Sequence, residues 1–306
     1  MKKNRLGTSD LYVSALGLGC MSLGTDKKKA ASIIDQAVDL GVNYLDTADL
    51  YDFGLNEEIV GEAVKRRRQE VILATKVGNR WETGRDGWSW DPSKAYIKQQ
   101  VKNSLRRLQT DYIDLYQLHG GTIEDHIDET IEAFEELKAE GIIRHYGISS
   151  IRPNVIREYV QKSSIISVMM QYSILDRRPE EEIMDLLAQH GISIIARGPL
   201  AKGLLTNQGM EKLEEKFSGK DYLDYSYEEL CTILPKLQQL RPHHTLTETA
   251  IQYCLHSPVV GAVIPGASSI KQLKENVDAA NAPSPSEQEW MQIQQLSKAN
   301  QYEAHR

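Results

Sequence analysis

The stretch NYLDTADLYDFG, residues 43–54, begins as a buried strand and ends as a polar turn. Tyr44 and Leu45 suit the interior of a sheet, whereas Asp46 ends the apolar run and Tyr51 follows after one short turn. An acid at the end of a strand either caps a turn or belongs to a functional site. Which of these applies to Asp46 depends on the fold that the rest of the chain predicts.

The junction before this stretch recurs along the chain. An amphipathic helix, a glycine and a short β-branched or aromatic run follow one another in AVDLGVNYLD, LKAEGIIRHYGIS and LLAQHGISIIA. Gly41, Gly141 and Gly191 each stand where the end of a helix favours a left-handed residue, and a strand is expected directly afterwards. Repeated joints of this kind predict a parallel sheet.

Short apolar runs between the predicted helices mark the strands. We predict eight, at residues 15–19, 43–47, 71–76, 112–119, 144–149, 166–171, 193–197 and 261–266. Their nearly continuous apolar character is typical of strands that are covered on both faces. Eight strand–helix units within 306 residues predict an α/β protein, a (β/α)8 TIM barrel that forms one domain over residues 1–306.

Four segments fall outside the simple repeat. Residues 5–14, RLGTSDLYVS, predict an N-terminal β-hairpin that closes the bottom of the barrel, and residues 284–301 predict an extra C-terminal helix. Residues 79–93 form an insertion after the third strand, with Trp81, Trp88 and Trp90. These rings either wall a substrate pocket or pack on the barrel rim. Residues 203–230 are predicted as another long loop.

Composition and charge exclude several classes of protein. The chain is 41% hydrophobic and 26% charged, as ordinary globular proteins are. Its formal net charge of −7 argues against a nucleic-acid partner. No run reaches the ~18 apolar residues of a membrane span. Three widely spaced cysteines favour a reduced, cytoplasmic protein, and the histidine spacing predicts no metal site.

Polar side chains follow several of the predicted strands. In a TIM barrel, polar residues at the C-terminal ends of the strands line the active site, whereas elsewhere they usually serve stability. Each also has a simpler interpretation: Asp46 as a cap, Tyr51 as loop packing, Lys76 as a solvated strand end and His119 as a core histidine. Their joint position at successive strand ends favours one common site. The strand-end residues are Asp46, Tyr51, Lys76, His119, Ser149, Ser150, Gln171 and Arg197.

The chemistry of four of these residues is complementary. A tyrosine hydroxyl has a pKa near ~10, too high for an efficient proton donor at neutral pH. A lysine cation such as Lys76 beside Tyr51 would stabilise the phenolate, and Asp46 would hold the lysine in place. His119 could orient a substrate carbonyl. This set still needs a source of hydride, which no side chain supplies.

The motifs YLDTADLY, ATKVG and YQLHG, in this order and at these strand ends, resemble the aldo-keto reductases, which are NAD(P)H-dependent carbonyl reductases with a TIM-barrel fold. The likeness extends from LGTSDLYVSALGLG to VIPGASSIKQLKEN. It implies that Asp46, Tyr51, Lys76 and His119 are the catalytic tetrad, with Tyr51 as the general acid in reduction. It also implies a small-molecule carbonyl substrate, while the charge and the lack of a long apolar run predict no nucleic acid and no membrane as partner.

The resemblance also implies where the cofactor binds. Ser149 and Gln171 match residues that hold the nicotinamide carboxamide, while Ser150 stands where the family usually has asparagine. Arg197 replaces an aromatic ring that stacks on the nicotinamide in many members, and a planar guanidinium can stack in its place. The segment GPLAKGLL, residues 198–205, is similar to a loop over the pyrophosphate, with Leu200, Lys202 and Gly203 as contacts.

The motif after the last strand bears on the choice of nucleotide. Many members bind the adenosine 2′-phosphate through a lysine and an arginine, whereas this chain has Gly266 and Gln272 at those positions. It resembles the subgroup in which the adenosine is surrounded by Gly266, Ser268, Gln272, Glu275 and Asn276. Ser268 and Lys271 could still meet a phosphate at the start of the following helix. Because the family favours NADPH, the resemblance implies NADPH (NADP+) in preference to NADH.

Two other interpretations compete with this one. GLGCMSLG, residues 17–24, has the first two glycines of a dinucleotide-binding Rossmann motif, but Ser22 replaces the third and the motif gives Lys76 and His119 no role. The second alternative is a regulatory or sensor protein on the same fold, which binds the nucleotide with little turnover. Turnover of a reactive aldehyde would distinguish it from an enzyme.

Overall fold

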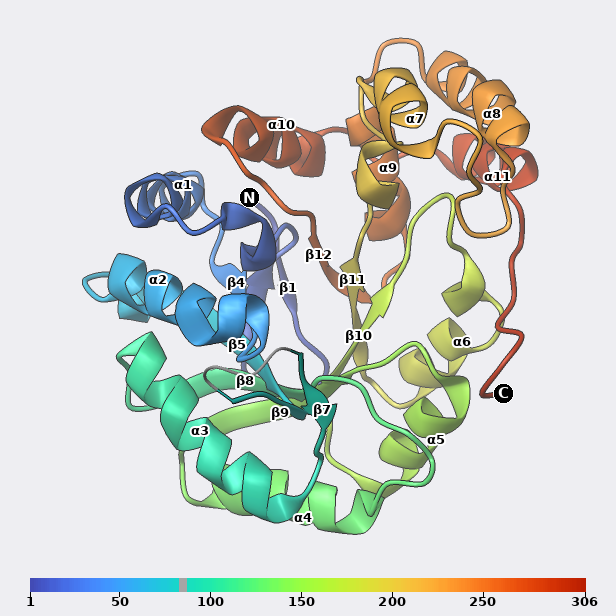
Figure 1. The fold of residues 1–306 in the computed structure, drawn as a ribbon. Helices are drawn as coiled ribbons and strands as arrows, with labels where there is room; N and C mark the ends of the chain where they lie inside the picture. The colour runs from blue at the N-terminus through green and yellow to red at the C-terminus, as the bar shows by residue number, and fades with distance from the viewer. Residues whose placement is uncertain (83–86) are drawn as a thin grey trace.

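The computed structural model describes residues 1–82 and 87–306 and has a barrel of parallel strands surrounded by helices (Figure 1). The predicted TIM barrel is thus confirmed. The barrel strands, in chain order, are β3 (Leu18–Gly19), β4 (Tyr44–Asp46), β5 (Ile72–Val77), β8 (Ile113–Leu118), β9 (Ile143–Ser149), β10 (Ser167–Gln171), β11 (Ser193–Arg197) and β12 (Val260–Ile264). Each overlaps a predicted strand, although β3 begins three residues later and β12 ends two residues earlier than predicted.

Helices cover the outside of the sheet (Figure 1). They are α1 (Lys27–Asp39), α2 (Leu55–Val64), α3 (Lys94–Leu108), α4 (Ile127–Ala139), α5 (Pro153–Lys162), α6 (Ile183–Gln189), α7 (Gly209–Phe217), α8 (Tyr227–Leu240), α9 (Leu246–His256), α10 (Ile270–Asn281) and α11 (Glu287–Leu296). In α3, for example, Ile97, Val101 and Leu108 are buried against the sheet, as their helical spacing predicts.

The barrel closes where its first strand meets its last. The eight strands are ordered β12-β11-β10-β9-β8-β5-β4-β3, and parallel bridges from Leu16 to Val263 and from Gly19 to Gly266 join the two ends. Gly17 lies at this seam, and a Cβ atom there would be 2.5 Å from the ring of Tyr44 and 2.7 Å from Ile264. The glycines of GLGCMSLG therefore allow close packing at the seam, which argues against the Rossmann interpretation.

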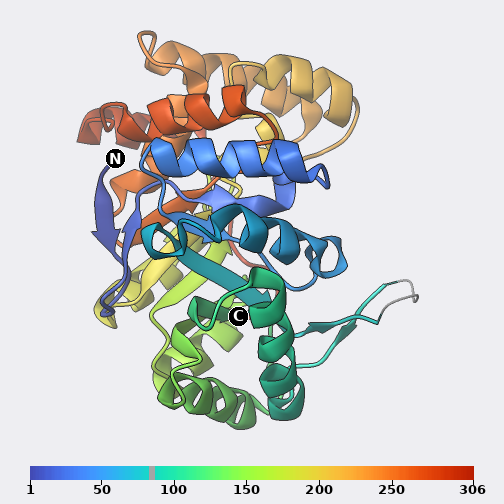
Figure 2. The same cartoon turned by 90° about the vertical axis from the view of Figure 1, so that its left-hand side faces the viewer.

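An N-terminal hairpin forms the floor of the barrel, as predicted. Its strands β1 (Lys3–Arg5) and β2 (Tyr12–Ser14) pair antiparallel. Leu6, Leu11 and Val13 join the interior core with side chains from the barrel strands, including Tyr44, Leu115 and Ile195. Figure 2 shows this hairpin at the end of the barrel opposite the one from which a second hairpin projects.

The second hairpin lies in the insertion after β5. Its strands are β6 (Asn79–Arg80) and β7 (Ser89–Trp90), and residues 83–86 of the insertion lie outside the described ranges. Trp81 donates from Nε1 to the Asp49 carbonyl, 3.0 Å away, and Trp90 donates to Asp125 at 2.9 Å. Trp88 is 57% exposed. Two of the three rings therefore pack on the barrel rim, and the third faces solvent.

Two sequence expectations need correction. The prediction of a long loop at residues 203–230 is wrong, because this segment contains α7 and begins α8, with Tyr222 and Tyr225 buried. The cause is tertiary packing, since Leu213 and Phe217 of α7 enter the main core. The extra C-terminal helix is present as α11 but is shorter than predicted. Across residues 1–82 and 87–306, no helix has the length and apolar character of a membrane span.

Candidate active site

Three of the predicted catalytic residues meet at the ends of β4 and β5. Asp46 ends β4, Lys76 is the penultimate residue of β5, and Tyr51 lies in the turn that leads to α2. The Lys76 ammonium donates to Asp46 Oδ2 at 2.6 Å and to the Tyr51 hydroxyl at 3.1 Å. It also donates to the Thr47 carbonyl at 2.7 Å. The Lys76 ammonium thus links Asp46 with Tyr51.

Lys76 is almost entirely buried, with 1% of its side chain exposed. Burial by itself would lower the pKa of Lys76, but the neighbouring Asp46 and Tyr51 more than offset this effect and raise it. Gln117 of β8 adds a weaker contact to Asp46 Oδ1 at 3.4 Å. The lysine therefore stays charged beside the tyrosine hydroxyl. A solvated strand end, the simpler interpretation of Lys76, is excluded by its burial.

His119 completes the group from the next strand. It follows β8, and its ring meets the ring of Tyr51 edge-on, with centroids 5.8 Å apart. Burial, followed by the charges of Lys76 and Arg197, lowers the pKa of His119 to about 3. Neither ring nitrogen has a hydrogen-bond partner among residues 1–82 and 87–306, and Nδ1 is buried. A neutral imidazole with a free N–H suits a donor to a substrate oxygen.

Side chains predicted to hold the nicotinamide lie at the ends of three adjacent strands. Met169 of β10 pairs with Ser149 of β9, and Gln171 pairs with Arg197 of β11. Arg197 Nη1 donates to Gln171 Oε1 at 3.0 Å, whereas the Gln171 amide nitrogen and the Ser149 hydroxyl have no partner within the described part of the chain. These free groups fit a carboxamide, which needs both a donor and an acceptor.

Ser150, which stands where the family usually has asparagine, differs from Ser149 in its contacts. It is buried, and its Oγ accepts from the backbone N–H of Arg152 at 3.2 Å. The hydroxyl therefore stabilises the start of α5, which begins at Pro153.

The segment after β11 has unusual backbone angles. Ala201 and Lys202 have φ values of 47° and 57°, in the left-handed region, and Gly203 follows at 96°. The non-glycine residues are strained there, and strain of this kind clusters at ligand-binding segments. Lys202 is exposed, and Leu200 is half-buried. The three predicted contacts of this loop thus lie together at the surface beside the end of β11.

The predicted adenosine residues surround the junction of β12 and α10. Gly266 is exposed, and a Cβ atom there would lie 2.5 Å from the Ser22 hydroxyl. Gln272 Oε1 accepts from the backbone N–H and the hydroxyl of Ser268, at 2.9 and 3.0 Å. Asn276 donates to the Gly266 carbonyl at 3.2 Å. Two of the predicted contacts therefore also shape the junction itself.

The same junction carries two exposed charges. Glu275 lies one helical turn after Lys271, and their charged atoms are 3.9 Å apart. The Lys271 side chain is 83% exposed, so its ammonium is free to turn toward an anion at the start of α10. The first turn of α10 itself contains no acidic residue. This arrangement is compatible with a phosphate near the helix start.

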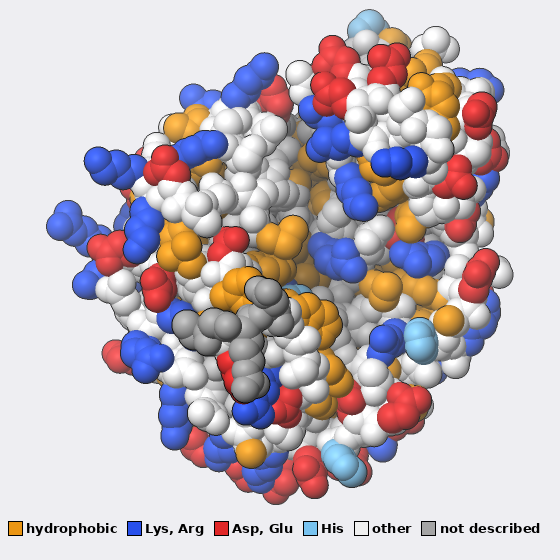
Figure 3. All heavy atoms as spheres, viewed as in Figure 1, with side chains coloured by type: hydrophobic (Ala, Val, Ile, Leu, Met, Phe, Trp, Pro, Cys, Tyr) orange, Lys and Arg blue, Asp and Glu red, His pale blue; other side chains and the backbone are white. Residues whose placement is uncertain are grey.

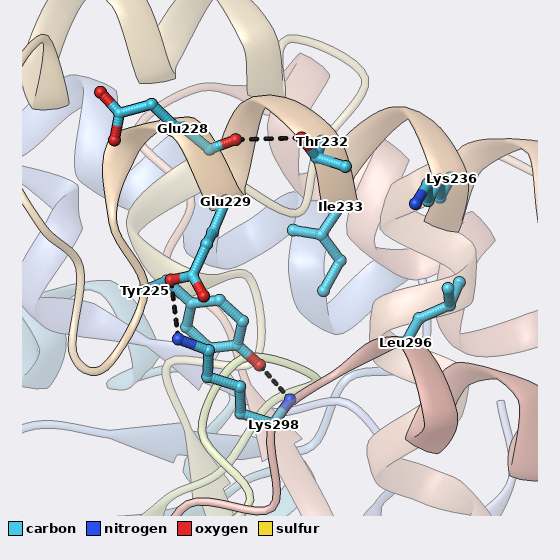
Figure 4. Close-up of a pocket in the computed structure, with 8 residues that line it drawn as sticks. All are labelled: Tyr225, Glu228, Glu229, Thr232, Ile233, Lys236, Leu296 and Lys298. Carbon is cyan, nitrogen blue, oxygen red and sulfur yellow. Dashed lines mark hydrogen bonds and ion pairs between the residues drawn. The ribbon is translucent and has the colours of Figure 1, made fainter.

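The molecule is hollowed at the centre of the face that carries the β6–β7 hairpin (Figure 3). A separate cavity, of about 370 Å³, lies between α8 and the segment after α11 (Figure 4), and two larger cavities lie elsewhere on the molecule. In the cavity of Figure 4, Lys298 pairs with Glu229, and the Lys298 backbone N–H donates to the Tyr225 hydroxyl. No cluster of three metal-ligating side chains occurs in residues 1–82 and 87–306. The strand ends are therefore the best candidate for chemistry.

Comparison with known proteins agrees with this geometry. The model of the aldo/keto reductase family matches residues 15–298. The chain belongs to the aldo/keto reductase family. It is 61% identical to the uncharacterized oxidoreductase YqkF of Bacillus subtilis, over the full length of both proteins. It is 32% identical to the NADH-specific methylglyoxal reductase of Escherichia coli, over 92% of this chain and 94% of the relative.

A solved structure of the family has nearly the same fold. The holo form of aldo-keto reductase AKR11C1 from Bacillus halodurans has a TM-score of 0.95 and 61% sequence identity, over 100% of this chain and 99% of that chain. Its apo form has a TM-score of 0.87 over the same shares of the two chains, with 57% identity. The protein is thus a carbonyl-reducing oxidoreductase of an NAD(P)H-dependent family. This assignment favours the enzyme over the regulatory or sensor alternative.

Sequence reasoning missed the buried polar residues behind Tyr51. Asp49 and Glu57 are fully buried, and Arg107 of α3 pairs with Glu57 at 2.6 Å. A signal was present, because Gln100, Ser104 and Arg107 repeat at helical spacing beside the apolar stripe of α3. That spacing shows a polar stripe but does not show what it faces.

Proposed function

We propose that the protein reduces aldehyde or ketone carbonyls to alcohols with NADPH, and that Tyr51 supplies the proton. When bound, the nicotinamide supplies a hydride to the carbonyl carbon. The carbonyl oxygen then takes the proton of the Tyr51 hydroxyl, which leaves a phenolate. The observation that carries this proposal is the buried Lys76 ammonium, 3.1 Å from the Tyr51 oxygen and paired with Asp46. This cation stabilises the phenolate as it forms.

His119 has an orienting role in this proposal. As a neutral donor it binds the carbonyl oxygen without competing with Tyr51 for the proton. Asp46 fixes Lys76 and keeps the total charge of the site low. In the reverse direction, oxidation of an alcohol, the Tyr51 phenolate accepts the proton and Lys76 again balances its charge. The four residues act as one unit in either direction.

The cofactor is held in this proposal by residues from three parts of the barrel face. Ser149 and Gln171 would hold the carboxamide, and Arg197 would face the nicotinamide. Leu200, Lys202 and Gly203 would hold the pyrophosphate. The adenosine half would be held by Gly266, Ser268, Gln272, Glu275 and Asn276. We favour NADPH over NADH because Lys271 and the start of α10 offer positive charge to a 2′-phosphate.

Methylglyoxal is a sensible first substrate, because the Escherichia coli relative is named for reducing it. That relative is NADH-specific by name, so both nucleotides belong in the first assays. A reactive aromatic aldehyde such as 4-nitrobenzaldehyde provides a general test of carbonyl reduction. These compounds probe the reaction class, and a wider panel of aldehydes, ketones and sugars would define the preferred substrate.

The test of the mechanism is Tyr51→Phe, which removes one hydroxyl. Loss of a general acid lowers turnover by about 10²–10⁴-fold, so NADPH oxidation with 4-nitrobenzaldehyde should fall by that factor. NADPH binding, followed by the fluorescence of the nucleotide, should stay near wild type. Tyr12→Phe is the matched control, because Tyr12 lies on the hairpin at the barrel floor and is exposed. Wild-type turnover in Tyr51→Phe would refute the assignment of the acid.

A further inference from the structure

The turn that carries Tyr51 has a costly backbone conformation. Asp52 and Phe53 have φ values of 49° and 52°, and Gly54 follows at 88°. Three successive residues are therefore left-handed, and only glycine adopts this region without strain. Such a turn persists only where neighbouring groups hold it in place. Since Tyr51 directly precedes it, those groups also set the position of the tyrosine hydroxyl.

Two side chains from outside the turn hold it. A Cβ atom on Gly54 would lie 2.9 Å from Arg107 Cδ and 3.1 Å from Trp81 Cζ2, so both side chains press against the glycine backbone. Trp81 meets the Phe53 ring edge-on, with centroids 5.7 Å apart. It also donates from Nε1 to the Asp49 carbonyl at 3.0 Å. The turn is thus fixed on both sides of Tyr51.

Arg107 connects this turn with the strand that carries Lys76. Its Nε donates to Glu57 Oε2 at 2.6 Å, and Glu57 Oε1 accepts from the Thr75 hydroxyl at 2.6 Å. Glu57 lies in α2, directly after the turn, while Thr75 precedes Lys76 in β5. One carboxylate therefore joins the Tyr51 side of the site to the Lys76 side. The Arg107 guanidinium also lies over the Trp81 ring, 5.9 Å from its centroid.

The charges in this buried region depend on Arg107. Burial, and then the nearby charge of Glu57, raises the pKa of Asp49 well above its usual value. Asp49 is fully buried, and Gln100 and the backbone of Leu50 only partly offset this rise in pKa. Arg107 is the cation that faces the buried Glu57 carboxylate, with their charged atoms 2.6 Å apart. Removal of Arg107 would leave the buried Glu57 side chain without its ion-pair partner, which displaces it.

We propose that Arg107 is a positioning residue for catalysis: through Glu57 and Trp81 it holds the strained turn so that the Tyr51 hydroxyl stays beside the Lys76 ammonium. This inference rests on the proposed role of Tyr51. Arg107 acts at a distance from the cofactor residues at the ends of β9 to β12. Its loss therefore affects the proton-transfer geometry and leaves nucleotide binding intact.

The test compares Arg107→Met with Arg106→Met. Arg106 is the neighbouring arginine of α3, and among residues 1–82 and 87–306 its side chain bonds only to Asn103 on the surface. A misplacement of about 1 Å can cost ~100-fold in rate, so kcat of Arg107→Met should fall by about 10- to 100-fold, with KM for NADPH unchanged. Arg106→Met should keep the wild-type kcat. In Arg107→Ala, added guanidinium at millimolar concentration should restore part of kcat.

Trp81→Phe provides a second test if Arg107→Met fails to fold. It removes the hydrogen bond to the Asp49 carbonyl and no charge, so kcat should fall several-fold while thermal stability stays near wild type. A purely structural role for Arg107 predicts a lower melting temperature with full kcat per folded molecule, and no rescue by guanidinium. Full kcat in both Arg107→Met and Trp81→Phe would overturn the proposal.

The outcome is separable from that of the proposed function. If Tyr51→Phe turns over at the wild-type rate, Tyr51 is not the acid and the proposed function fails. If Tyr51→Phe is inactive and Arg107→Met is fully active, the acid stands and only the positioning role fails. Both variants and the Arg106→Met control use the same assay of NADPH oxidation.

Discussion

At the scale of single residues, the site depends on a lysine that is hidden from water. An isolated buried ammonium is costly, and Lys76 is tolerated because Asp46, Tyr51 and the Thr47 carbonyl accept its three donors. Asp46, Thr47 and Tyr51 lie within residues 46–51, and Lys76 lies in the next strand. Sequence reasoning could therefore name Asp46 and Tyr51 before their shared contact with Lys76 was known.

His119 gives a prediction at the same scale. Its pKa is lowered from 6.5 to about 3 in the folded protein, so between these values the unfolded chain binds more protons. Stability must then rise with pH across this window, and it is lost as the pH falls from 6.5 toward 3. From pH 7 to pH 5, His119 should contribute a loss of about 2 kcal/mol in the free energy of unfolding.

Urea unfolding of the wild type and of His119→Gln at pH 7 and pH 5 measures this contribution. Other titrating groups affect both proteins alike. Between pH 7 and pH 5 the free energy of unfolding should therefore fall by about 2 kcal/mol more in the wild type than in the variant. Equal losses in the two proteins would show that His119 is not held neutral by the fold.

At the scale of elements, the N-terminal hairpin acts as the floor of the barrel. Its residues Leu6, Leu11 and Val13 are buried in the interior core, while Tyr12 between them faces solvent. Leu11, Tyr12 and Val13 are buried, exposed and buried in turn, as side chains that point to opposite faces of a strand are, and Ser14 is buried as well. This hairpin was predictable from the sequence because both its strands and its turn lie within residues 3–14.

We expect the floor to be important for stability. Leu11→Ala should cost about 2–5 kcal/mol, the usual range for a fully buried leucine, and it should do so without changing the KM for NADPH. Tyr12→Ala, at the 55% exposed neighbour, should stay within about 0.5 kcal/mol of wild type. Chemical denaturation of the two variants measures the difference, and a mild effect of Leu11→Ala would mean that the floor is loosely packed.

At the scale of the whole molecule, one barrel face unites residues that are far apart in the chain. Ser149, Gln171, Arg197 and Gly266 come from four successive strands or their ends, and the seam joins the last strand to the first. We propose that residues 1–306 form one domain, because strands from β4 to β12, including β10 and β11, share the interior core with the floor hairpin. A ligand on that face then stabilises the entire barrel.

Cofactor binding should shift the whole unfolding transition. A nucleotide at 100 times its Kd adds about 2.7 kcal/mol to the free energy of unfolding. The floor hairpin and the cofactor-binding face should unfold in the same transition, with and without nucleotide. At equal concentrations NADPH should raise the melting temperature more than NADH. Thermal scans followed by circular dichroism and by tryptophan fluorescence test both points. Separate transitions would argue against one domain, and a larger shift with NADH would reverse the proposed preference.

The sequence by itself determined the eight strands, the floor hairpin and the residues at the strand ends, because these follow from local periodicity and short-range pattern. Tertiary structure decided what spacing cannot show. It placed α7 where a loop was predicted, packed Trp81 and Trp90 on the rim, and used Gly17 to close the seam. It also paired Glu57 with Arg107 across 50 positions of the chain. Such pairings depend on which helices meet around the barrel, and that is a property of the closed fold.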